Sequence, residues 1–387
     1  MRMKPQNILN LLLVLSVFST NRLAGAEGKE KKNSSGTDEL FSDAKILHVK
    51  IEIPPAGLAA LKSEPRKYVK ATVREGDKVY ADIGLRLKGN GTFQPMEKKP
   101  SLALKFNEFT SGVKFHGHGK IFLNNSLQDG SYMSEAIGGQ IFRAADVPAS
   151  KVTFARVELN GRDVGLYVLA EAVNHDFLSQ YFKKTKGNLY EGTNSDVTDR
   201  LEQDSGETSK DQADLKALAN AAKETDPAQR WKKLGSVLDL ERFISFAAVE
   251  VLTWHRDGYS MDKNNYRLYH DPASGQMVFI PHGLDQLFSK PSGALVPEWK
   301  GLVAKAVLET PDGQRRFRER IYKLLGTAFK ADALHAQITQ LAGTIRPGLT
   351  KESETKAFDT AVAQLKDRIS QRARFLEEEL KKGPATR

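Results

Sequence analysis

The sequence predicts an α+β fold in which a β-rich N-terminal half precedes a helix-rich C-terminal half. In the first half, residues 69–89 and 151–173 each contain two runs of alternating apolar and polar side chains around a turn with glycine, which is typical of β-hairpins. In the second half, residues 240–255 have the dense apolar spacing of a buried helix, and residues 300–385 continue as helices with a strongly charged end.

The elements of the N-terminal half follow from local signals. Alternation predicts a half-buried strand over residues 46–54, and the hairpin turns are expected at Glu75-Gly76-Asp77 and Asn160-Gly161. We expect a helix from Ser131, as its N-cap, to about Arg143, because a Ser-Glu pair suits the first turn. Two further strands and a short helix are predicted over residues 101–109, 120–125 and 174–182.

The C-terminal half begins with a polar segment for which we predict helices. Residues 196–235 are acidic and polar with few large apolar side chains, and we predict helical structure there. A polar run, TWHRDGYSMDKNNYRLYHD at 253–271, follows the predicted buried helix. Strand-like sequence then covers residues 265–271 and 276–283.

The N-terminus has the features of a secretory signal peptide. A basic start precedes an apolar run, Ile8–Phe18, and the small residues Ala24-Gly25-Ala26, so we predict a signal peptide over residues 1–26. A retained membrane anchor is the alternative, but the apolar run is shorter than the roughly 20 residues that span a bilayer. Residues 27–42 are predicted to be a disordered linker, and 43–385 to be the folded domain.

Composition limits the chemistry that the chain can carry out. The absence of cysteine excludes disulfides, thiol catalysis and zinc sites with Cys ligands. A net charge of +10 favours anionic partners such as phosphates. The lysines are scattered and form no basic stripe, so we expect no nucleic-acid partner.

Basic residues gather around a glycine loop. A strand runs into Gly89-Asn90-Gly91-Thr92, where backbone N–H groups can approach an anion. Arg86 and Lys88 are two residues apart and therefore share one face of this strand. Lys105 lies on the next predicted strand and Lys99 at its entrance, and either could hold nucleotide phosphates and pair with Glu135 on the following helix. An ordinary turn with solvent-exposed lysines is the alternative.

Three oxygen-bearing residues could orient a hydroxyl group and hold a metal. His255-Arg256-Asp257 has the residue order that begins the catalytic loop of protein kinases. Asp262 follows in the same loop, and Asp285 follows an apolar strand, as a metal-binding Asp does in kinases. The alternative is that each Asp is a cap or a turn residue.

Separated sequence motifs then resemble one family, the CotH family of spore-coat-type atypical protein kinases. The resemblance covers roughly residues 45–290, and the motifs occur in the family's order. They are RLKGNGTF with KKPSLALKF (86–106), LNGRDVGLYVLAEAVNHDFL (159–178), GNLYEG (187–192), DGYSMDKNNYRLYHDP (257–272) and FIPHGLDQLF (279–288).

The resemblance implies a kinase-like fold with an N-lobe over about 43–173 and a C-lobe over about 174–385. It also implies ATP and Mg²⁺ (or Mn²⁺) as cofactors, and Ser/Thr residues of secreted or coat proteins as acceptors. In the family pattern Asp257 matches the catalytic Asp and Asp285 the metal-binding Asp. The resemblance also places Arg86, Lys99, Lys105 and Glu171 near the nucleotide, and Asp262 near the metal. From the residues themselves we add Lys88, which shares the strand face of Arg86, to the nucleotide site and Asn265 to the metal site.

Two positions depart from the family pattern. Asp262 stands where the family often has Asn, and Gly283 stands where many members carry a second carboxylate. We therefore keep two expectations. The first is an exported or envelope-located protein Ser/Thr kinase without a stable membrane insertion after signal cleavage. The second is a catalytically inactive kinase-like scaffold of the envelope or coat, and a wall-polymer-binding protein ranks below both.

Overall fold

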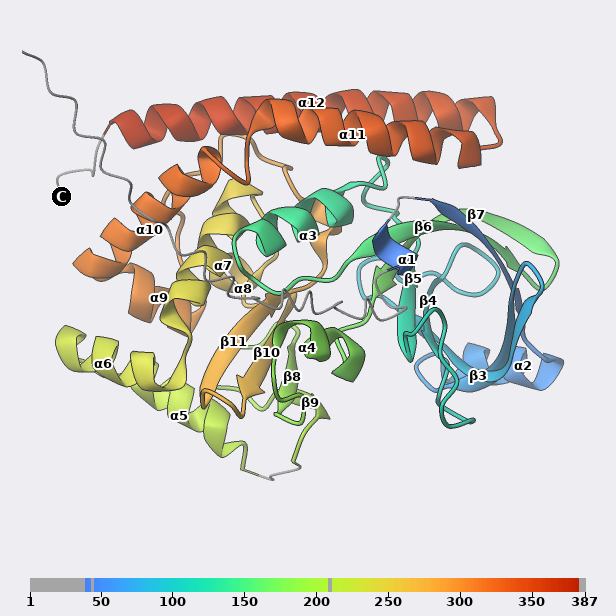
Figure 1. Ribbon diagram of the computed structural model, residues 1–387, viewed down its shortest axis with the longest axis horizontal. Coiled ribbons are helices and arrows are strands. Elements are labelled where there is room, and N and C mark those ends of the chain that lie inside the picture. Colours follow the sequence, from blue (N-terminus) through green and yellow to red (C-terminus); the bar gives the residue numbers. More distant parts are fainter. Residues whose placement is uncertain (1–38, 43–44, 208–210, 383–387) are drawn as a thin grey trace, which may run out of the picture. The chain divides into compact units, whose positions relative to one another are not determined.

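The computed structural model describes residues 39–42, 45–207 and 211–382, and residues 36–387 group into one compact unit. The predicted signal peptide, 1–26, lies outside the described residues, and so does the predicted linker up to residue 38. Strands predominate up to Glu171 and helices predominate after Ala213 (Figure 1). The predicted α+β class is confirmed.

The strands up to Glu171 close into a barrel with neighbours in the order β1-β2-β3-β4-β5-β7-β6. All its pairings are antiparallel except that of β1 with β6, which is parallel. Both predicted hairpins are confirmed as β2–β3 and β6–β7. The strands are β1 (Ile46–Glu52), β2 (Val69–Glu75), β3 (Lys78–Lys88), β4 (Ser101–Lys105), β5 (Lys120–Asn124), β6 (Val152–Leu159) and β7 (Arg162–Glu171).

The two faces of the barrel wall differ in chemistry. Leu85 and Leu87 of β3 are buried in the barrel interior, so Arg86 and Lys88 lie on the outer face, as the strand alternation predicts. Arg86 lies opposite Ala103 of β4, and Ala103 lies opposite Phe122 of β5. The outer face of β3, β4 and β5 therefore carries cations around a small apolar centre.

Helix α3 (Ser134–Ala144) begins later than the sequence predicts. Ser131 is not its N-cap, because Asp129 takes that role from outside the helix: its Oδ2 accepts from the N–H of Ser134 at 2.8 Å and its Oδ1 from the N–H of Ser131 at 2.9 Å. Ser131 instead accepts a bond from the N–H of Met133 at 3.2 Å. A carboxylate suits the positive end of the helix better than a hydroxyl group does.

A second, four-stranded sheet has the order β11-β10-β8-β9. Its edge strand β9 occupies part of the segment 196–235, where the sequence predicts helices, because Glu202–Ser205 pair antiparallel with β8. The rest of that segment includes α5 and α6. The strands are β8 (Leu189–Gly192), β9 (Glu202–Ser205), β10 (Tyr266–Asp271) and β11 (Gln276–Pro281).

Helix α7 (Leu240–Leu252) is buried along its length after its first turn, as predicted, and precedes the polar loop that starts at Thr253. Helix α12 (Glu352–Lys381) packs against it. The buried Arg372 of α12 donates to the last carbonyls of α7, at 2.6 Å to Val251 and 3.4 Å to Leu252. The polar loop therefore starts from a fixed point.

The remaining helices complete the fold (Figure 1). Among the described residues, no helix combines the length and the apolar character that crossing a membrane would require. The helices are α1 (Glu39–Ser42), α2 (Pro55–Ser63), α4 (His175–Tyr181), α5 (Ala213–Ala222), α6 (Pro227–Val237), α8 (Tyr259–Asp262), α9 (Leu302–Leu308), α10 (Pro311–Leu325) and α11 (Ala331–Ile345), with short 3₁₀ turns η1 (Leu284–Gln286) and η2 (Arg346–Gly348).

The predicted linker extends too far at its C-terminal end. Residues Glu39–Ser42 form α1, and Leu40 is fully buried in the interior of the barrel. A polar composition predicts disorder, but Leu40 and Phe41 pack against the barrel core, and burial of such side chains stabilises the turn.

We expect Leu40→Ala to lower the free energy of unfolding by about 2–5 kcal/mol, because it leaves a cavity in the barrel core. The exposed Leu127 provides the control, since Leu127→Ala should change stability by no more than about 0.5 kcal/mol. Urea denaturation of both variants measures the effect. Equal, small losses would show that α1 does not belong to the folded unit.

Candidate functional site

Asp257 lies in the loop between α7 and β10, and two asparagines fix its carboxylate. The side-chain amide of Asn265 donates to Asp257 Oδ2 at 2.6 Å and to the Asp257 carbonyl at 3.0 Å. The amide of Asn264 donates to Asp257 Oδ1 at 3.2 Å. Asn265 has a φ of 49°, in the left-handed region that Asn tolerates better than most residues. The loop thus presents a carboxylate in a fixed orientation.

Backbone hydrogen bonds join this loop to the segment that carries Asp285. The N–H of His282 donates to the Asn265 carbonyl at 2.9 Å, and His255 Nε2 lies 3.1 Å from the His282 carbonyl. Asp285 follows on η1. Asp257 and Asp285 are 28 positions apart in the sequence numbering, and these bonds bring their two segments together.

The charge state of Asp285 reflects this convergence. Burial raises the pKa of Asp285, and the carboxylates of Asp129 and Asp257 add to the rise. The ammonium of Lys88 and the backbone N–H of Asp285 oppose it. Two neighbouring carboxylates that repel each other form an environment that a cation would stabilise.

Lys88 reaches the same place from the barrel through a buried polar network. Its Nζ donates to Asn124 Oδ1 at 2.6 Å, and the Asn124 amide donates to both carboxylate oxygens of Glu135 at 2.9 Å. Burial raises the pKa of Glu135 to about 7, and the neighbouring Asp285 adds to the rise. Glu135 on α3 therefore pairs with Lys88 through Asn124, and not with Lys99 or Lys105 as the sequence suggested.

Lys120 is a functional candidate that the sequence analysis missed. It lies on β5 with its Nζ 5.4 Å from the centre of the Phe122 ring, while Lys88 lies 4.4 Å from the same ring. Burial lowers the pKa of Lys120 to about 8, and Arg267 and Arg86 lower it further, while Asp204 opposes them. Within the described part of the chain, its ammonium forms no ion pair or hydrogen bond. The sequence did contain a signal for it: Lys120 and Phe122 are two residues apart on one predicted strand and therefore share a face.

The other predicted basic residues lie elsewhere on the barrel. Lys99 lies against Tyr132 and Tyr167, at 5.1 and 5.2 Å from their ring centres, and burial lowers its pKa to about 8. Lys105 forms an ion pair with Glu108 at 2.5 Å. Lys99 therefore does not join Lys88 and Asp285.

Arg86 and Glu171 have different local partners. Arg86 stacks over the Tyr68 ring at 5.4 Å and also acts electrostatically on Lys120. Glu171 is buried, and its carboxylate accepts from the Gln180 amide and, at 3.2 Å, from the N–H of Lys151. Burial raises the pKa of Glu171. Its bonds hold the end of β7, and Glu171 lines the same small cavity as Glu135 and Gly283.

A small apolar cluster lies among these polar groups. It consists of Ala103, Phe122, Ala170 and Ala172, with Val152 packed against it. Phe122, Val152 and Ala170 also line a cavity of about 30 Å³ that Glu135 and Gly283 border. The side chains of the cluster are buried, and the cavity has room for no more than a water molecule or two.

The candidate metal ligands are few. Within residues 39–42, 45–207 and 211–382, no group of three or more His, Cys, Asp or Glu side chains is arranged to hold a metal ion. Asp257, Asp285 and Asn265 nevertheless carry oxygen atoms of the hard type that Mg²⁺ uses together with substrate phosphates and water. Asp262 is occupied differently, since its carboxylate pairs with Lys300 at 3.1 Å and Arg256 at 3.7 Å.

The structure gives a reason why position 283 holds a glycine where many family members carry a carboxylate. Its φ is +60°, and a Cβ added there would lie 2.5 Å from Oδ1 of Asn265. A side chain at this position would therefore displace the residue that fixes Asp257.

Comparisons with known proteins agree with the motifs. Residues 85–376 match the family model described as CotH kinase protein. The chain is similar to the inner spore coat protein H of Bacillus subtilis (strain 168), with 21% identity over 293 residues, which cover 69% of this chain and 80% of that protein. It is also similar to the invasin CotH2 of Rhizopus delemar, with 24% identity over 309 residues, which cover 70% of this chain and 50% of the invasin. The match thus spans half the length of that invasin.

Solved structures give weaker matches. HipA in the toxin–antitoxin complex of Shewanella oneidensis MR-1 aligns with a TM-score of 0.34 and 11% identity, over 68% of this chain and 60% of that chain. The proinflammatory kinase CtkA of Helicobacter pylori aligns with a TM-score of 0.34 and 9% identity, over 76% of this chain and 96% of that chain. These scores are too low to carry a conclusion about the fold.

We expect Gly283→Ala to destabilise the protein more than Gly275→Ala does. Both glycines have a positive φ, so both variants acquire about 1–2 kcal/mol of backbone strain, but only Gly283 has a neighbour within 4 Å. Urea denaturation measures the loss of unfolding free energy in each variant. The amount by which the loss in Gly283→Ala exceeds that in Gly275→Ala is the free energy needed to move Asn265. Equal losses would show that Asn265 yields freely and that a carboxylate could be accommodated at position 283.

A second prediction concerns the buried Glu250, which supports the loop from behind. Its Oε2 accepts from the N–H of Ser260 at 3.0 Å, and burial raises its pKa to about 8 from the usual 4.5 of a glutamate. The folded state therefore keeps a proton that the unfolded state releases above pH 4.5. This contribution to stability is present below pH 4.5 and is lost as the pH rises toward 8.

Glu250→Gln should remove this pH dependence. Relative to the variant, the wild-type protein should lose a few kcal/mol of unfolding free energy between pH 5 and 8, at a slope of up to about 1.4 kcal/mol per pH unit. Denaturation at several pH values measures the difference. The exposed Glu298→Gln is the control and should keep the wild-type profile, whereas parallel profiles for Glu250→Gln would contradict the prediction.

Proposed function

Because the chain belongs to the CotH kinase family, we propose that it is an exported atypical protein kinase that transfers the γ-phosphate of ATP to Ser or Thr hydroxyl groups of proteins outside the cytoplasm. The observation that carries this proposal is the bonding that joins the loop of Asp257 to the segment of Asp285, with Lys88 and Glu135 facing them. Positioned charge of this kind supplies most of the catalysis in phosphoryl transfer.

The proposed architecture is a kinase-like fold of two lobes. The N-lobe would comprise the barrel and α3, over about residues 43–173, and the C-lobe the second sheet and the later helices, over about 174–385. The polar groups described above come from both parts, because Lys88, Lys120 and Glu135 precede the proposed boundary and Asp257 and Asp285 follow it. A nucleotide would lie between them.

Asp257 is the proposed catalytic residue. Its carboxylate would accept a hydrogen bond from the acceptor hydroxyl and align that oxygen with the γ-phosphorus. The bond from the hydroxyl oxygen to phosphorus forms as the bond from phosphorus to the β,γ-bridging oxygen breaks, and ADP leaves. The hydroxyl proton passes to Asp257 and then to solvent.

Residues of both parts would hold the nucleotide. Lys88 and Lys120 would neutralise phosphate charge, with Arg86 contributing to the same positive field. Lys99, Lys105 and Glu171 have partners of their own in the barrel, so the proposal does not depend on them.

Mg²⁺ or Mn²⁺, when bound, would neutralise the β- and γ-phosphates and orient them. Asp285 and the amide oxygen of Asn265 would hold the ion beside Asp257. Asp262 keeps its ion pair with Lys300 in this proposal and shapes the loop electrostatically.

The proposed location is outside the cytoplasm, in the periplasm, cell envelope or a secreted coat. The signal-peptide features of residues 1–26 support it. The names of the two relatives, a spore coat protein and an invasin, refer to proteins of coats and surfaces and agree with it.

The second candidate function is a non-enzymatic scaffold with the same fold. The ion pairs of Asp262 favour it, because they occupy one of the three aspartates that the sequence predicts at the site. A scaffold would not require the nucleotide, and ATP is scarce outside the cytoplasm.

We expect Asp257→Asn and Asp285→Asn each to reduce phosphate transfer from radiolabelled ATP to a Ser/Thr-rich protein by at least 10²-fold, because each removes a group that acts on the reacting phosphate. The exposed Asp332→Asn is the matched control and should retain wild-type transfer.

Lys88→Met and Lys120→Met should raise the ATP concentration needed for half-maximal transfer.

Thermal shift separates the two candidate functions. ATP with Mg²⁺ or Mn²⁺ should raise the Tm of the wild-type protein, since a ligand that binds only the native state must stabilise it. No shift at millimolar ATP, together with no transfer, would reject the kinase and favour the scaffold. Transfer that survives in both Asp variants would reject the assignment of the site.

A further inference from the structure

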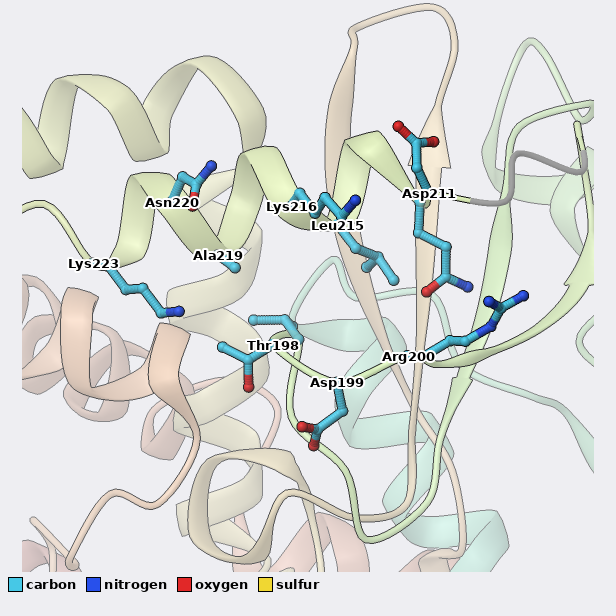
Figure 2. Close-up of a pocket in the computed structure, with 11 residues that line it drawn as sticks. Thr198, Asp199, Arg200, Asp211, Leu215, Lys216, Ala219, Asn220 and Lys223 are labelled. Carbon is cyan, nitrogen blue, oxygen red and sulfur yellow. The ribbon is translucent and has the colours of Figure 1, made fainter.

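A groove of about 350 Å³ opens between α5 and residues 197–200 (Figure 2). Its floor is apolar, since the side chains of Val197, Leu215 and Ala219 line it and are buried. Polar and charged side chains form its rim. None of these residues belongs to the proposed catalytic site. The volume falls in the usual range of about 300–1,000 Å³ for ligand sites.

The groove is held open by hydrogen bonds between its two walls. Gln212, at the start of α5, donates from its side-chain amide to the Leu201 carbonyl at 2.8 Å and accepts from the Leu201 N–H at 3.3 Å. Within the loop wall, Asp199 accepts from the N–H of Asp196 at 2.8 Å. Asp196 is anchored in turn by the N–H of Leu302 at 2.9 Å. A partner would therefore find a preformed surface.

The loop wall is also connected to the catalytic loop. The N–H of Asn194 donates to Asn264 Oδ1 at 3.0 Å, and the amide of the same Asn264 holds Asp257 at 3.2 Å. Thr198 follows Asn194 by four residues, a backbone span of at most about 14 Å. A peptide with its hydroxyl group at Asp257 would need only a few more residues to reach the groove.

The charges on the rim favour an anionic occupant. Arg200, Lys216 and Lys223 are exposed and form no ion pair within residues 39–42, 45–207 and 211–382. In Figure 2, Lys223 and Arg200 lie toward opposite ends of the groove, and Lys216 extends from α5 between them. The carboxylates on the rim are those of Asp199, which accepts the bond from Asp196, and Asp211. Although the segment 196–235 as a whole is acidic, the groove itself is lined by three cations and two carboxylates, so its rim carries a net positive charge.

We propose that this groove docks an acidic segment of the protein substrate, a few residues away from the phosphorylated Ser or Thr. The proposal rests on the proposed kinase function, because it names a feature of that kinase's substrate. The spread of the cations suits an extended chain with several carboxylates better than one compact anion. The buried apolar floor gives such a chain a surface to lie on.

Direct binding tests the groove without any catalysis. We would measure the anisotropy of a fluorescein-labelled peptide with four Glu residues in 50 mM salt and without ATP, beside peptides with Gln or Lys at the same positions. The Glu peptide should bind at least tenfold more tightly than the Gln peptide. Raising the salt to 500 mM should weaken its binding, because exposed charge pairs are screened.

Charge reversal locates the binding. The double variant Lys216→Glu/Lys223→Glu should weaken binding of the Glu peptide by about tenfold. The double variant Lys323→Glu/Lys330→Glu changes the net charge equally at exposed positions in α10 and before α11, and should leave the affinity unchanged. Circular dichroism confirms that both variants fold.

Three results of the binding measurements would overturn the docking proposal. They are equal or tighter binding of the Gln or Lys peptide, equal weakening by the two double variants, and no weakening by the groove variant. In transfer assays, an acidic segment four to eight residues from the acceptor should lower KM about tenfold with little change in kcat. Transfer with no such preference would reject the docking groove and leave the kinase proposal standing. Binding of the Glu peptide at the groove without transfer would reject the kinase and retain the groove as an acidic-peptide site.

Discussion

The functional region depends on the compensation of opposite charges that the fold buries together. Lys88 from the barrel, Glu135 from α3 and Asp285 after β11 come from three separate elements, and each would be costly to bury alone. Asn124 completes the arrangement by bonding to Lys88 and Glu135 at once. Displacing any of the three elements would leave an unpaired charge in a poorly hydrated place, so the electrostatics fix the relative position of the elements around the site.

The loop that carries Asp257 is supported from behind by groups that never reach the candidate site. Arg372 donates to the last carbonyls of α7, and Glu250 accepts from the N–H of Ser260. His255 contacts the His282 carbonyl and so couples this loop to the segment of Asp285. These neighbouring groups therefore fix the orientation of Asp257. Any function that depends on a positioned carboxylate requires such support.

Local signals in the sequence were enough for part of the fold. The turn Asn160-Gly161 and the alternation around it define a hairpin, and the continuous apolar spacing of 240–255 defines a buried helix. Closure of the barrel could not be predicted, because it requires the parallel pairing of β1 with β6 across more than 100 residues of sequence. Strand β9 and helix α1 were missed for a similar reason: their few residues are ordered by β8 and by the barrel core.

The sequence by itself determined the chemical identity of the candidate site. The motifs around Asp257 and Asp285 follow from residue order. Strand alternation places the side chains of Lys88 and Leu87 on different faces of β3. The tertiary structure alone decided which polar groups meet. It brings Glu135 to Lys88 through Asn124, directs Asp262 to Lys300, places Lys99 against tyrosines and adds Lys120. Periodicity fixes which face of an element a side chain occupies, but the partner across that face depends on how distant segments pack, and no local pattern encodes it.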